Sequence, residues 1–92
     1  MTAPLKLADE IEAGSDVRVM AYDKRHRLLL ATALRLAEAY LVELDAYSKL
    51  VEMVWKHPTD RPAWQEADRV AGEKWKALKE AEAVYLAAKE GA

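Results

Sequence analysis

Residues 28–55 read LLLATALRLAEAYLVELDAYSKLVEMVW, and this stretch decides the fold. Its apolar residues recur at alternating steps of three and four, and no charged residue interrupts the series, which is typical of an amphipathic helix. A strand is excluded because the apolar residues do not alternate with polar ones and the stretch holds no Gly or Pro. We call this series the seam, and its members are Leu30, Ala33, Ala37, Tyr40, Leu44, Tyr47, Val51 and Val54.

Further large apolar residues flank the seam on both sides. Leu34, Leu41 and Trp55 lie on one flank, and Leu29, Leu36 and Leu50 lie on the other. The apolar surface is therefore wider than one partner helix covers. We expect a homodimer in which two copies of the chain complete a four-helix bundle.

Composition and length are those of one small helical domain. The chain has 92 residues, of which 52% are hydrophobic and 33% charged, with three Gly and three Pro. Without Cys it forms no disulfide, and we expect a reducing, cytoplasmic setting. Residues 1–13 lack the pattern of a signal peptide, and no apolar run of about 18 residues predicts a membrane span. The net charge of −2 gives no general attraction to nucleic acid.

The sequence predicts an all-α fold, with a short N-terminal helix followed by a long antiparallel helical hairpin. Thr2 is a suitable cap for the short helix and Gly14 a suitable stop, whereas Pro58 must end the long helix. The expected bounds are 3–13 for the short helix, 16–57 for the long helix, 58–61 for the turn and 62–89 for the last helix. One alternative stays open, in which residues 17–22 are extended and Asp23 is the true cap.

The last helix is expected to pair with the seam. Because the turn is short, the two long helices must run antiparallel, and we expect facing positions whose numbers sum to roughly 119. This register places Trp64 beside Trp55, and Trp75 beside Leu44 and Tyr47.

Aromatic composition points to a protein interface. Three Trp and four Tyr without any Phe give rings that bury a large surface yet keep a polar edge, as interfaces favour. The alternative is an ordinary hairpin core whose polar edges face water. The candidate interface residues are Leu29, Leu36, Tyr40, Tyr47, Leu50, Trp55, Trp64 and Trp75.

Charge is uneven along the long helix, which is basic at its start and acidic from residue 38 to 52. In an antiparallel dimer such helices would pair opposite ends. The basic residues are also candidates for binding phosphate groups, although no nucleic-acid motif accompanies them. The cluster comprises Arg18, Lys24, Arg25, Arg27 and Arg35.

Catalytic and metal-binding motifs are not found. Asp23 and His26 have the spacing of two metal ligands on a helix, but carboxylate metal sites need further ligands on facing helices. The sequence has no nucleophile elbow, glycine-rich phosphate loop or HExxH motif. An enzyme would need Lys74 buried in a polar pocket, whereas an exposed seam-edge lysine is more common.

We therefore expect no catalytic activity, no metal and no cofactor. The predicted function is a non-catalytic protein–protein interaction module: a small adaptor, assembly factor or inhibitor, of the kind that phages and mobile elements encode. Its predicted partners are a second copy of itself and a further protein, with no membrane. The alternative function is a nucleic-acid-associated regulator that uses the basic cluster.

Overall fold

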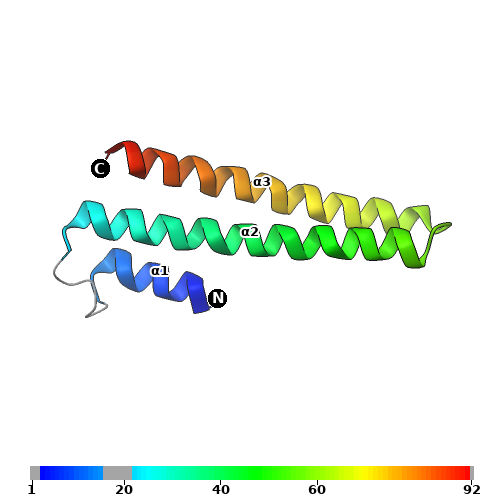
Figure 1. Ribbon diagram of the computed structural model, residues 1–92, viewed down its shortest axis with the longest axis horizontal. Coiled ribbons are helices and arrows are strands. Elements are labelled where there is room, and N and C mark those ends of the chain that lie inside the picture. The colour runs from blue at the N-terminus through cyan, green and yellow to red at the C-terminus, as the bar shows by residue number, and fades with distance from the viewer. Residues whose placement is uncertain (1–2, 16–21, 92) are drawn as a thin grey trace.

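The computed structural model describes residues 3–15 and 22–91, and within these residues the fold is all-helical. Helix α1 spans Ala3–Ala13, α2 spans Lys24–Lys56 and α3 spans Arg61–Gly91. Figure 1 shows α2 between the other two, with α3 antiparallel to it along its length and α1 beside its N-terminal part only. The predicted helical hairpin is thus confirmed, and α2 and α3 pack against each other.

The start of α2 differs from the main expectation. The helix begins at Lys24 rather than near residue 16, and Tyr22 and Asp23 lie outside it. Asp23 has extended backbone angles, and its carboxylate accepts a hydrogen bond from the backbone N–H of His26 at 2.9 Å. This N-cap satisfies an N–H that otherwise has no partner inside the helix, so the helix starts there. Residues 17–21, expected to be helical, lie outside the described residues.

The turn between the long helices follows the sequence signals. α2 ends at Lys56, two residues before Pro58, because a residue that precedes proline is forced out of the helical region. Asp60 then caps α3, with its carboxylate accepting the backbone N–H of Ala63 at 3.2 Å. Pro62 occupies the first turn of α3, where a missing N–H costs nothing.

Small side chains line the contact between α2 and α3. Ala46 of α2 is buried there, as are Ala71 and Leu78 of α3. Two surface hollows show which residues of the helices face each other, because Val42 and Lys74 line one of them and Met53 and Ala63 line the other. In both pairs the two residue numbers sum to 116. Alanines at a helix crossing let the two backbones approach closely.

The expectation that the seam faces α3 is wrong. Every seam residue except Ala33 is exposed, and Ala33 is half-buried. The aromatic contacts expected in the hairpin do not form a core either, since Trp55 is 85% exposed and Trp75 is 53% exposed. The hairpin contact buries Leu78 together with alanines, whereas most seam side chains stay exposed.

Helix α1 packs against the N-terminal part of α2 (Figure 1). Ala8, Ile11 and Ala31 form a buried cluster, against which Leu7 and Leu34 pack. Ion pairs fix the edge of this contact, because the Arg35 guanidinium lies 2.9 Å from Asp9 and 2.5 Å from Glu12. Hydrogen bonds from Arg35 to Glu12 and Asp9 raise the pKa of the guanidinium.

Gly14 ends α1 in the left-handed region, with a φ of 76°. A side chain at this position would also collide with the Arg27 guanidinium, which packs over the glycine. The positive φ is the reason that glycine is favoured at this position, whereas the Arg27 side chain could move aside for a larger residue.

The molecule is a flat layer rather than a globule. Its Cα extents are 56 × 24 × 14 Å and its radius of gyration is 16.9 Å. A compact domain of this length has a radius of gyration of about 12 Å. Among the described helices, none is long and apolar enough to cross a membrane.

Candidate protein-interaction face

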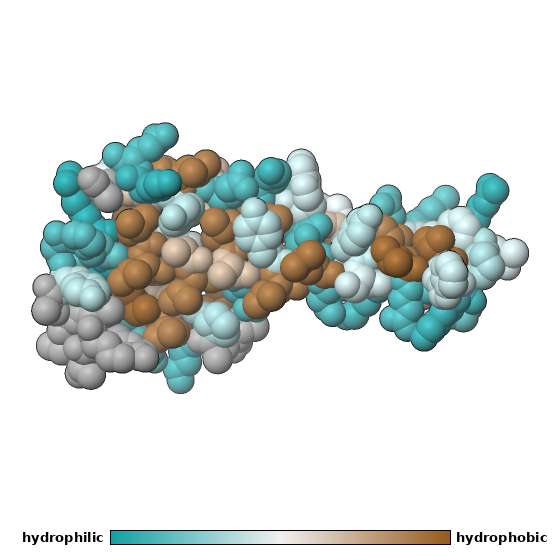
Figure 2. Space-filling view, in the orientation of Figure 1, coloured by the Kyte–Doolittle hydropathy of each residue, from teal (hydrophilic) through white to brown (hydrophobic). Residues whose placement is uncertain are grey.

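One side of α2 carries a row of exposed large apolar side chains, which we call the apolar face. Its members are Leu30, Tyr40, Leu41, Leu44, Tyr47, Val51, Val54 and Trp55. They lie along α2 from its second turn to its end, a span of roughly 36 Å at 1.5 Å per residue. Figure 2 shows hydrophobic side chains gathered over α2 at the broad end of the molecule and again toward the hairpin tip. Exposed apolar side chains gathered on one side of a helix are characteristic of interaction sites.

The opposite side of α2 is different in character. Val42 lies two residues before Leu44, and Lys49 lies two residues before Val51. Two residues correspond to about 200° around a helix, so Val42 and Lys49 lie on the side opposite to the apolar face. Val42 borders a shallow hollow of about 210 Å³ together with charged side chains, among them Arg35, Glu38 and Lys74. Lys74 is only half-buried, and the hollow is open rather than an enclosed catalytic pocket. One side of the molecule therefore carries the apolar face. The opposite side carries both apolar and charged side chains, and we call it the mixed side.

Charged pairs lie at the edge of the apolar face. The Lys56 ammonium is 2.6 Å from the Glu52 carboxylate, and a hydrogen bond from Lys56 lowers the pKa of Glu52. Asp45, which is next to Leu44, pairs at 3.1 Å with Lys49, whose backbone lies toward the opposite side of α2. An apolar centre with a charged rim is the usual organisation of a protein–protein interface.

The candidate interface residues from the sequence divide into two groups. Tyr40, Tyr47 and Trp55 belong to the apolar face, and Trp75 is also exposed, with the Lys79 ammonium 5.5 Å from its ring centre. The other four are half-buried: Leu29, Leu36, Leu50 and Trp64.

Trp64 has a structural role at the hairpin turn. Its indole N–H donates a hydrogen bond to the backbone carbonyl of His57 at 2.7 Å. The same carbonyl also accepts the backbone N–H of Asp60 at 3.1 Å, so the indole is its second donor. The bond ties α3 to the turn.

Sequence reasoning assigned Leu44, Val51 and Val54 to the hairpin contact, whereas the structure exposes them. A signal was present in the small residues of the other stripe of α2, which include Ala39 and Ala46. The alanines of α3 are equally small, and two helices approach most closely where both carry small side chains. Matching the small residues of the two helices would therefore have predicted this pairing.

The basic cluster is not assembled into one patch by the described residues. Arg35 is held by the two carboxylates of α1, and Arg27 packs over Gly14. Lys24 and Arg25 are exposed at the start of α2. Arg18 lies outside the described residues.

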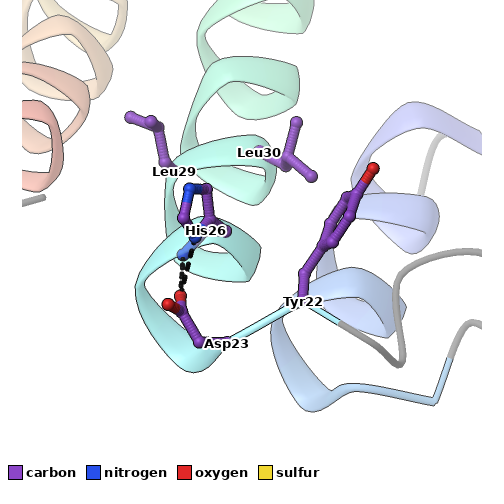
Figure 3. Close-up of a pocket in the computed structure, with 5 residues that line it drawn as sticks. All are labelled: Tyr22, Asp23, His26, Leu29 and Leu30. Atoms are coloured by element: carbon purple, nitrogen blue, oxygen red, sulfur yellow. Dashed lines mark hydrogen bonds and ion pairs between the residues drawn. The ribbon is translucent and has the colours of Figure 1, made fainter.

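A hollow of about 610 Å³ lies at the N-terminal end of the apolar face, lined by Tyr22, Asp23, His26, Leu29 and Leu30. Figure 3 shows Asp23 bonded to His26 in the first turn of α2, with the Tyr22 ring on the side of α1. One Asp23 oxygen accepts the His26 backbone N–H and also lies 2.9 Å from the His26 ring Nδ1. The backbone hydrogen bond from His26, followed by the ring contact, lowers the pKa of Asp23.

Asp23 and His26 thus act as a helix cap in this structure. Among residues 3–15 and 22–91, no group of three or more His, Asp or Glu side chains is placed to hold a metal ion. The chemistry at this end is that of an apolar hollow with one polar edge.

Comparison with known protein families, with characterised proteins and with solved structures found no match to this chain.

Proposed function

We propose that this protein is a non-catalytic protein–protein interaction module, an adaptor, assembly factor or inhibitor that binds through the apolar face of α2. The observation that carries the proposal is the amount of surface that the chain leaves in water. Its accessible surface is 6712 Å², whereas a compact protein of this mass exposes about 5,400 Å². The surplus of about 1,300 Å² exceeds the roughly 800 Å² that each partner buries in a standard interface, so the chain has area enough for one.

The apolar face has enough hydrophobic area to drive association. Each of its eight side chains is between 40% and 85% exposed. Burying the exposed part of one such side chain contributes about 1 kcal/mol, so the whole face contributes on the order of 10 kcal/mol before association costs. The partner's surface contributes a similar amount, and the sum of about 20 kcal/mol exceeds the association cost of roughly 4–15 kcal/mol.

Part of the proposal is that association completes a four-helix bundle. Stable domains pack two layers of secondary structure around one core, and this chain supplies a single layer with one apolar side. A second helical hairpin placed on that side would supply the missing layer. Two copies of the chain provide four long helices without any other component.

Matched valine variants test the proposal. Val51 on the apolar face is 53% exposed and Val84 on α3 is 55% exposed. Val84 is seven residues after Ala77, which lines the hollow on the mixed side, so it lies on that side of α3. Val51→Glu would place a charge in the interface, whereas Val84→Glu adds the same charge outside it.

Sedimentation of the full chain should show association that Val51→Glu weakens at least about 100-fold and Val84→Glu leaves within about threefold. The same two variants are then used as baits in extracts of the native host. If both variants self-associate and capture host proteins as the unmodified chain does, the apolar face is not an interaction site and the proposal is wrong.

A further inference from the structure

We infer that the apolar face is covered by a second copy of this chain, stacked face to face and antiparallel about a two-fold axis at the level of residue 42 along α2. The inference rests on the proposed function and specifies the occupant and its direction. The axis is placed at this level because residue 42 is midway along α2 between Leu30 and Val54, the first and last residues of the seam. All seam residues except Ala33 are exposed.

The first argument is surface area. The chain exposes about 1,300 Å² more than a compact protein of its mass, and a standard interface buries about 800 Å² per partner. A closed dimer gives each copy the same interface, so one standard-sized contact would remove more than half of the surplus on both chains. A small peptide ligand would leave most of a face this long uncovered.

The second argument is shape. Helix α1 has 11 residues and lies beside the N-terminal part of α2, so the layer is three helices wide at one end and two helices wide at the hairpin tip (Figure 1). Figure 2 shows the same taper in the space-filling view. Antiparallel stacking lays the wide end of each copy over the narrow end of the other. Parallel stacking would leave both tips, with Val54 and Trp55, outside the thick part of the dimer.

The third argument is charge. The first turns of α2 carry Lys24, Arg25 and Arg27 and no acidic residue. A parallel dimer would place these cations opposite their own copies, which is unfavourable. An antiparallel dimer places them opposite the last turns of the partner's α2 and the following turn. There the acids Glu52 and Asp60 lie among Lys49, Lys56 and Arg61, so the cations meet a segment of mixed charge rather than a purely basic one.

The absence of cysteine allows the direction to be measured directly. Lys24→Cys and Lys56→Cys place single spin labels at the two ends of α2, at exposed positions. In the antiparallel dimer, two labels at position 24 are separated by about 54 Å along the helices, and two labels at position 56 by about 42 Å. A mixed dimer, with label 24 on one chain and label 56 on the other, brings the labels to within about 20 Å.

A parallel dimer gives the reverse pattern, with short distances for each single variant and about 48 Å for the mixed sample. Electron–electron double resonance distinguishes the two patterns, and sedimentation of the labelled chains confirms that they associate. Long single-variant distances with a short mixed distance support the inference, and the reverse pattern overturns it.

A chain that stays monomeric also overturns the inference. In that case the proposed function is judged separately, because it survives only if Val51→Glu, and not Val84→Glu, abolishes capture of another protein.

Discussion

Truncating Leu78 and Leu44 to alanine distinguishes the two ways in which α2 and α3 can pair. Leu78 is 5% exposed in the contact between the helices, whereas Leu44 on the apolar face is 56% exposed. If the seam were the hairpin contact, both residues would be buried and both substitutions would leave a cavity. In the observed structure only Leu78 occupies the core of a single chain.

The two substitutions therefore have different expected costs. Leu78→Ala removes a buried side chain and leaves a cavity, which costs about 2–5 kcal/mol. Leu44 is less than half buried, so its truncation costs about 1 kcal/mol or less of the free energy of unfolding of the monomer. The substitutions are the same, so differences in helix propensity cancel between them.

Association must be removed for this comparison, because Leu44 also contributes to the proposed dimer. Both substitutions are made in chains that carry Val51→Glu, and sedimentation establishes that these chains are monomeric. Urea unfolding is then followed by helical circular dichroism, and the two free energies of unfolding are compared. Equal losses for Leu44→Ala and Leu78→Ala would show that the seam packs inside the chain, and would refute the pairing described above.

Three further substitutions test local features. Gly14→Ala should cost about 1 kcal/mol or more, because alanine is strained at positive φ. Hydrogen exchange should show faster opening of α1. Arg35→Gln should loosen α1 in the same measurement, with less effect at high salt, where the original ion pairs are already screened. Because the bond from His26 lowers the pKa of Asp23, the charged cap stabilises the fold above the ordinary carboxyl pKa and this contribution is lost as pH falls through the lowered value. The stability difference from Asp23→Asn, measured by thermal unfolding, should therefore be constant near neutral pH and shrink below about pH 4.

Sequence patterns predicted the elements of the fold well because their signals are local. Pro58 and Asp60 act through the backbone of their own turn, so the end of α2 and the start of α3 were found closely. The start of α2 was harder, because both Asp16 and Asp23 are suitable caps by residue type. Which of the two is used depends on the conformation of the chain between them, and residue type alone does not determine it.

The candidate site was predicted only in part, for a different reason. Periodicity identifies the apolar stripes of a helix, but it does not say which stripe pairs within the chain. Leu44 and Tyr47 were assigned to the hairpin contact by a register that set the seam against the last helix. Ala46 and Ala71 instead form the contact, since small side chains allow a closer approach of the two backbones.

This arrangement links folding to association. A contact built from residues such as Ala46 and Ala71 buries little apolar area, so it opposes the conformational entropy of two long helices only weakly. The larger hydrophobic contribution is held by side chains such as Leu41 and Leu44, and these become buried only when a second layer is added. In the proposed dimer, most of the stabilising area would therefore belong to the complex rather than to the single chain. The midpoint of unfolding should then rise with protein concentration, as it does when binding and folding are linked, and Val51→Glu should remove that dependence.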